Sequence, residues 1–179
     1  MNRLPLLFIL ILTLLSPMVM AEGAGGIESF QVLGQDLLPG AGKLELLSST
    51  GIVSTIGGLG YGVDEDGFVV GGFGMAVTSK GNPATYGGYG GTIQGWQHRW
   101  GPLVGLFTTR VGFGGIYRDH HAGLSLLGMA GAQMGVRLMP WFVLGVEGGL
   151  AGTITWTKGN SLSLAYAPTV GVRLLWGAF

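Results

Sequence analysis

Residues 141–157 read WFVLGVEGGLAGTITWT, and this stretch decides the fold because its side chains alternate in kind. Even positions are mostly large and apolar, as at Leu144 and Val146, whereas odd positions are mostly small or hydroxylated and include Glu147. Successive side chains of a β-strand point to opposite faces, so this alternation predicts a strand with one apolar face and one small or polar face.

The same period of two recurs along the rest of the chain. Residues 161–176 repeat it, and the Lys158-Gly159-Asn160 sequence before them predicts a hairpin turn. Weaker copies predict further strands near 51–63, 67–78, 85–97, 102–117 and 122–138. The breaks between these runs are rich in Gly, Pro, Asp and Asn, which favour turns. Seven antiparallel strands are therefore predicted.

If these strands close into a barrel of the bacterial membrane type, for which the argument follows below, their number should be even, so we expect an eighth strand before residue 51. Its candidates are 43–49 and 27–33, both short. The other interpretation of this region is a short helix that plugs or caps the barrel, with Phe30, Leu33, Leu37 and Leu38 on one face and Pro39-Gly40 at its end. The predicted organisation is a signal peptide (1–21), an N-terminal segment that is a linker, a short helix or the first strand (22–42), and a barrel (43–179).

The first 21 residues resemble a secretory signal peptide. A basic start at Arg3 precedes the apolar run 4–15, and small residues lead to a predicted cleavage site after Ala21. The chain has no cysteine, so disulfides cannot stabilise the exported protein. Export is therefore the first functional expectation.

The composition argues against an ordinary soluble domain. Of 179 residues 37 are glycine, only 10% are charged, and the mean hydropathy is +0.51. A water-soluble surface needs more charge than this. The formal net charge is zero, so there is no basic surface for nucleic acid, and none is expected as a partner.

Long strands with an unpartnered apolar face need lipid around that face, and in lipid a sheet must close so that every backbone group is paired. We therefore predict an all-β fold: an antiparallel, up-and-down transmembrane β-barrel of eight strands. Aromatic residues fall near the predicted strand ends, as they do where a barrel meets the membrane interface. The predicted interface aromatics are Trp96, Trp100, Trp141 and Trp176 at one end and Tyr86, Tyr117 and Trp156 at the other.

On these features the chain resembles the small Gram-negative outer-membrane barrels of the OmpA/OmpX type. The resemblance covers about residues 43–179 and rests on the signal peptide, the alternating strands, the short turns on one side and the terminal Phe179. It implies location in the outer membrane, outer-membrane lipid as surroundings, and recognition of the C-terminal strand by the barrel assembly machinery. The apolar positions at 170, 172, 174 and 176 are one residue out of step with Phe179, which indicates a bulge near Gly177 or a degenerate signal.

Four charged residues lie inside predicted strands, and their parity places them on the inward face: Arg110, Arg137, Glu147 and Arg173. The hairpins bring Glu147 near Gly171 or Arg173 on one side and near Gln133 on the other. Buried charges must be paired, so these five polar residues (Arg110, Gln133, Arg137, Glu147 and Arg173) are predicted to form an interior network. The network either fills and rigidifies the barrel or lines a narrow gate.

A titratable group, Asp119-His120-His121, falls in a predicted loop, with Ser125 four residues further on. Some small barrels are lipid A-modifying enzymes that use a His with a nearby Ser, but no motif of theirs is matched here. We therefore expect no catalytic residue, no metal site and no cofactor.

The function expected from the sequence is that of a structural, adhesin-like or narrow-pore barrel in the outer membrane of a Gram-negative bacterium. Two other classes stay open at this point. The first is a helical membrane protein packed through small residues such as Gly148 and Gly152. The second is a secreted, Gly-rich β-protein that self-assembles. The oligomeric state is not predicted.

Overall fold

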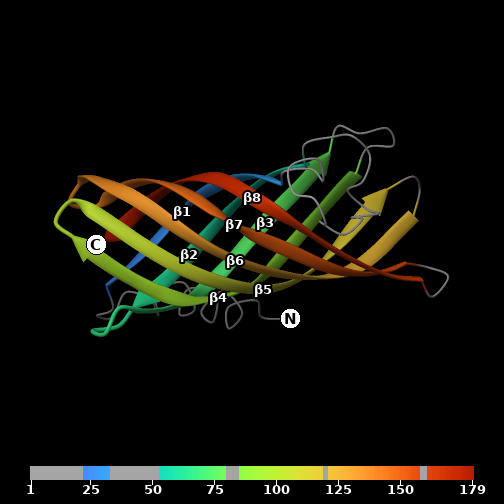
Figure 1. Cartoon of the computed structure of the whole chain (residues 1–179), viewed down its shortest axis with the longest axis horizontal. Coiled ribbons are helices and arrows are strands. Elements are labelled where there is room, and N and C mark those ends of the chain that lie inside the picture. Colours follow the sequence, from blue (N-terminus) through green and yellow to red (C-terminus); the bar gives the residue numbers. More distant parts are fainter. Residues whose placement is uncertain (1–21, 33–52, 80–84, 119–120, 158–160) are drawn as a thin grey trace, which may run out of the picture.

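The computed structural model is a closed barrel of eight antiparallel strands in chain order, β1-β2-β3-β4-β5-β6-β7-β8, with β8 paired to β1 (Figure 1). It describes residues 22–32, 53–79, 85–118, 121–157 and 161–179. The strands are β1 (Glu22–Val32), β2 (Val53–Val63), β3 (Phe68–Ser79), β4 (Thr85–Trp100), β5 (Leu103–Arg118), β6 (His121–Met139), β7 (Phe142–Thr157) and β8 (Ser161–Ala178).

The predicted all-β, up-and-down barrel is confirmed, and the seven predicted strands match β2 to β8. The largest difference lies at β4, which continues through His98 and Arg99 to Trp100, whereas a turn was predicted from His98 onward. The described residues form strands and no helix, so the interpretation as a helical membrane protein packed through small residues is wrong. None of them forms a helix long and apolar enough to cross a membrane.

The first strand, β1, lies at Glu22–Val32, so the barrel begins before residue 43. This strand overlaps the 27–33 candidate, and Phe30 belongs to it rather than to a helix. Three of the predictions lie outside the described residues: the strand candidate 43–49, the helix-face residues Leu33, Leu37 and Leu38, and the signal peptide at 1–21.

At one end of the barrel, short turns join neighbouring strands. Between β2 and β3, Oδ1 of Asp64 accepts hydrogen bonds from the amides of Asp66 at 3.1 Å and Phe68 at 2.7 Å. Gly67 completes this turn with φ of 82°, a left-handed conformation that glycine adopts without a steric penalty. The C-terminus lies at this same end, called the turn end below (Figure 1). The opposite end, where β3 ends at Ser79 and β5 ends at Arg118, is called the loop end.

Side chains alternate between the inside and the outside along every strand. On β7, for example, Val143, Gly145 and Glu147 are buried while Leu144 and Val146 are exposed. The registers run without a shift except between Arg137 and Met139, where β6 meets β7. One inward face and one outward face are thus fixed for the whole sheet.

Candidate functional site

The site with the strongest chemistry is a cluster of buried charges across the middle of the barrel. Glu28 of β1, Arg110 of β5, Glu147 of β7 and Arg173 of β8 all face inward and are at most 4% exposed. Two guanidinium groups meet two carboxylates, so the cluster is formally neutral. We call these four residues, together with Gln133 of β6, the charge layer.

Glu28 joins the two arginines. Its Oε1 accepts a hydrogen bond from Nη1 of Arg110 at 2.7 Å, and its Oε2 accepts one from Nε of Arg173 at 3.1 Å. Strands β1 and β5 are four positions apart in a ring of eight, so the bond between Glu28 and Arg110 crosses the full width of the barrel. The lumen is therefore spanned by an ion pair at this level.

Glu147 makes the second set of ion pairs. Nη2 of Arg110 lies 3.3 Å from its Oε2, and Nη2 of Arg173 also contacts Oε2. Nη1 of Arg173 donates to Oε1 of Gln133 at 2.7 Å. The predicted registers are confirmed, because Glu147 pairs with Gly171 on β8 and with Gln133 on β6.

Aromatic rings border the charge layer. The guanidinium carbon of Arg110 lies 5.0 Å from the centre of the Phe30 ring and 5.7 Å from that of Phe73. Phe30 also lies 5.6 Å from the guanidinium carbon of Arg173. A Cβ atom at Gly171 would collide with the Phe30 ring, so this glycine makes room for the ring. These cation–π contacts help to hold desolvated cations in place.

Of the five residues predicted for the network, the structure brings four together and leaves Arg137 out. Arg137 lies at the turn end, where Nη1 donates to the carbonyl of Phe179 at 3.2 Å and Nη2 to the carbonyl of Gly101 at 3.4 Å. Its inward parity is as predicted, but parity does not fix height along the barrel axis. Arg137 thus fastens the C-terminus to the turn between β4 and β5.

Glu28 is the residue that sequence reasoning missed. Its strand was left open between several interpretations, so the residue was never assigned a face. A signal was nevertheless present, because two or more inward arginines with one inward carboxylate imply a second carboxylate.

All seven predicted interface aromatics are exposed on the outer wall. Trp96, Trp100, Trp141 and Trp176 lie toward the turn end, whereas Tyr86, Tyr117 and Trp156 lie toward the loop end. They form two aromatic girdles, one toward each end of the part of the wall that β4 to β8 build.

Phe179 faces the inside and is 8% exposed, in step with Leu175 and Arg173. The pairing of β8 with β1 runs without a register shift through Trp176, Gly177 and Ala178, so the predicted bulge near Gly177 is not present. The terminal phenylalanine therefore does not share the outward face of Trp176.

Hydroxyl groups occupy the interior between the charge layer and the loop end. The Tyr89 hydroxyl donates to Oγ of Ser125 at 2.9 Å, and Ser125 shares a second bond of 2.9 Å with Oγ1 of Thr155. These bonds tie β4, β6 and β7 together. The side chain of His121 and residues 119–120 lie outside the described part of the chain.

The chain matches no protein-family model and is not significantly similar to any curated protein.

Proposed function

We propose that this protein is a closed structural β-barrel of the Gram-negative outer membrane, exported by a signal peptide at residues 1–21. The observation that carries the proposal is the outward face of the sheet. Among strand side chains that the structure describes, those facing outward include no Asp, Glu, Lys or Arg. Bulky apolar residues take their place at mid-strand, such as Val111 and Val146, which are each 59% exposed.

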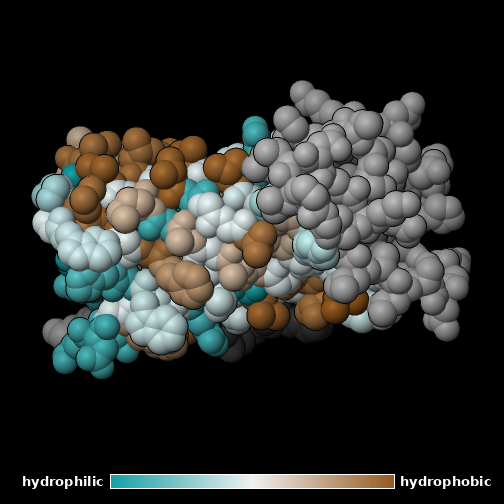
Figure 2. Space-filling view, viewed as in Figure 1, coloured by the Kyte–Doolittle hydropathy of each residue, from teal (hydrophilic) through white to brown (hydrophobic). Residues whose placement is uncertain are grey.

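This arrangement suits lipid rather than water. In the space-filling view, brown and pale side chains cover the middle of the visible wall, and teal ones gather mainly at the turn end (Figure 2). A charged side chain on the lipid face of such a barrel costs about 2–4 kcal/mol at the membrane midplane. The two aromatic girdles agree with two membrane interfaces.

Two further features support the proposal. The first strand begins at Glu22, directly after the predicted cleavage site, so removal of residues 1–21 would leave the barrel intact. Strand β8 closes the barrel against β1, which suits recognition of a C-terminal strand by the barrel assembly machinery. The resemblance to OmpA/OmpX-type barrels belongs to this proposal.

Within this class we propose a structural role rather than conduction. The pair between Glu28 and Arg110 spans the lumen, and the neighbouring Arg173 and Glu147 occupy the same level. Toward the turn end, Val69, Val104, Val143 and Leu175 fill the interior and are at most 1% exposed. An eight-stranded barrel has little room beyond its own side chains.

The test combines location and conduction. We expect the full chain to fractionate with the outer membrane, to lose residues 1–21, and to migrate differently on gels with and without boiling. In planar bilayers we expect no ohmic conductance. A soluble or inner-membrane protein without a heat-dependent shift would overturn the membrane proposal, whereas steady ion conductance would overturn the structural role and favour the narrow pore.

A further inference from the structure

A hollow of about 970 Å³ lies at the turn end of the barrel, on the side that the first four strands build. It is bounded by the start of β1, the turn between β2 and β3, and the end of β4. Hydrophilic side chains gather at this end in the space-filling view (Figure 2). The volume is within the range of ligand sites in proteins, about 300–1,000 Å³.

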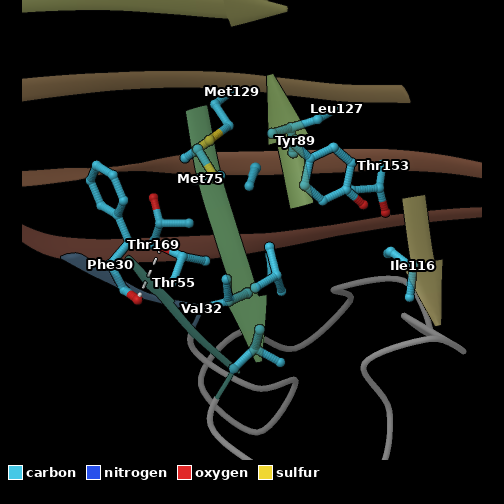
Figure 3. Close-up of a pocket in the computed structure, with 14 residues that line it drawn as sticks. Phe30, Val32, Thr55, Met75, Tyr89, Ile116, Leu127, Met129, Thr153 and Thr169 are labelled. Atoms are coloured by element: carbon cyan, nitrogen blue, oxygen red, sulfur yellow. Dashed lines mark hydrogen bonds between the residues drawn. The ribbon is translucent and has the colours of Figure 1, made fainter. Parts of the chain in front are cut away.

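The space inside the barrel, between the charge layer and the loop end, is much smaller. Figure 3 shows Phe30, Met75 and Met129 among the side chains that surround it. Only about 50 Å³ is free there, which gives room for no more than a few water molecules. A ligand larger than water therefore fits the hollow at the turn end and not this interior space.

The hollow has an excess of negative charge. It is lined by the carboxylates of Glu22, Asp64, Glu65 and Asp66 and by one guanidinium group, that of Arg99. Arg99 pairs with Glu22, and no other described cation pairs with the remaining three carboxylates. The proposed cleavage would add one positive charge, the new amino group of Glu22, and would still leave an excess of two negative charges. Such a hollow attracts a cationic partner.

The carboxylates suit an organic cation better than a metal ion. Oδ1 of Asp64 accepts two backbone amides of its own turn, and the carboxylate of Glu22 is held by Arg99. No group of three or more His, Asp or Glu among the described residues is arranged to hold a metal. The side chains of Glu65 and Asp66 are exposed, and their carboxylates can each accept charge-assisted hydrogen bonds from an ammonium or guanidinium group.

A buried amide beside this acidic turn adds a second requirement. Gln97 lines the hollow and is 6% exposed, and its backbone amide donates to the carbonyl of Gly67 at 2.7 Å, next to Asp66. Its side-chain Oε1 accepts from the Tyr61 hydroxyl at 3.2 Å, whereas its Nε2 has no hydrogen-bond partner among the described residues. A buried donor without a partner is unfavourable, so a ligand that brings an oxygen acceptor is favoured.

We propose that this hollow binds a basic segment of another polypeptide. A lysine or arginine side chain of the segment lies against Glu65 and Asp66, and one of its backbone carbonyls accepts a hydrogen bond from Nε2 of Gln97. A polypeptide carries both groups within a few bonds of each other, whereas a polyamine carries only the cation. The inference goes beyond the structural role, because it makes the barrel a docking point for a protein on the side that the turn end faces.

The test is binding of a labelled peptide to the protein purified from cells and placed in nanodiscs of zwitterionic lipid. The probe is an acetylated and amidated hexapeptide of alternating glycine and lysine, and fluorescence anisotropy measures its affinity. Two control peptides have glutamate or norleucine in place of lysine. We expect the lysine peptide to bind about tenfold more tightly than either control. Its affinity should fall as the salt concentration rises.

Matched variants locate the binding site. Asp66→Asn removes an exposed carboxylate of the hollow and should weaken binding of the lysine peptide by about fivefold. Asp119→Asn, in the connection between β5 and β6 at the other end of the barrel, makes the same change in net charge and should leave the affinity unchanged.

Gln97→Leu tests the hydrogen bond to the segment. It should weaken the lysine peptide by about fivefold but leave binding of spermidine unchanged, because spermidine has no carbonyl. Heat-dependent gel mobility checks that each variant folds, and Gln97→Met replaces Gln97→Leu if the latter does not.

The proposal is overturned if the glutamate or norleucine peptide binds as tightly as the lysine peptide, or if Asp66→Asn binds like the unaltered protein. Unchanged peptide binding by Gln97→Leu, or an equal loss for spermidine, would overturn the role of the Gln97 amide. Neither result would touch the membrane location, which fractionation tests separately.

Discussion

The outer and inner walls of this barrel are built from the same strands, yet the charged strand side chains that the structure describes lie only on the inner one. The outer wall exposes Val111 and Val146, whereas the inner wall buries Glu28, Arg110 and Arg173. In a soluble protein such charges would lie outside and such valines inside. The contrast teaches that each face has its own requirement: the outer wall is free of charge, as the proposed lipid surroundings need, and the inner wall compensates its charges within a largely apolar interior.

The largest effect is expected from a substitution in the charge layer of the inner wall. Glu28→Gln removes one of the two carboxylates that neutralise Arg110 and Arg173, so we expect the free energy of unfolding to fall by about 3–5 kcal/mol. Urea unfolding in lipid vesicles measures this. The matched control is Glu22→Gln, because Glu22 pairs with Arg99 at the exposed turn end and its loss should cost less than about 1 kcal/mol. Equal effects of the two variants would contradict a special role for the charge layer.

The second prediction concerns a charged substitution on the outer wall. Val111 lies near the middle of β5 and faces outward, so Val111→Arg should lower the free energy of unfolding by about 2–4 kcal/mol if lipid surrounds it. Leu103→Arg, at the turn end of the same strand, should cost only about 0–1 kcal/mol near the interface. Both are measured by unfolding from vesicles. A neutral Val111→Arg would show that this face meets water.

The third prediction compares the two walls on one strand, β6. A Cβ at Gly131 would meet the carboxylate of Glu147, whereas a Cβ at Gly128 would meet open space outside. Gly131→Val should therefore destabilise the barrel by about 1–3 kcal/mol through crowding. Gly128→Val should leave stability unchanged or raise it slightly. The same unfolding assay gives both numbers, and the reverse order would mean that the two faces have been assigned wrongly.

The smallest expected effect concerns the hydroxyls of the inner wall. Tyr89→Phe removes the donor to Ser125 but leaves the bond between Ser125 and Thr155 in place. We expect a loss of about 1 kcal/mol in the free energy of unfolding. Tyr86→Phe, on the outer wall of the same strand, is the comparison, and an equal loss there would remove the distinction between buried and interface hydroxyls.

Much of this architecture could be predicted from the sequence because the residue types along a barrel strand alternate between its inward and outward faces. The alternation in 141–157 predicted β7 to within one residue and placed Glu147 inside. The first strand could not be predicted as surely, because Glu22–Val32 is interrupted by glycine and has few bulky residues before Ile27. Its partner β8 is at the other end of the chain, so only closure of the barrel defines it.

The charge layer shows the same limit. Local parity identified Arg110, Glu147 and Arg173 as inward, and hairpin registers placed Gln133 beside Glu147. Glu28 reaches Arg110 across the lumen and Arg173 across the closing seam, and neither contact is local in sequence. Arg137 was assigned wrongly to this group because alternation gives the face of a side chain and not its height.

The surroundings of the outer wall are the central claim, and one measurement tests them most directly. The chain has no cysteine, so Val111→Cys provides a unique site for a fluorescent label in the full-length protein. In membranes we predict strong quenching by lipids that carry a nitroxide deep in their acyl chains, and almost none by a water-soluble quencher. Quenching by the soluble reagent alone would contradict a lipid-facing wall and with it the outer-membrane barrel proposed here.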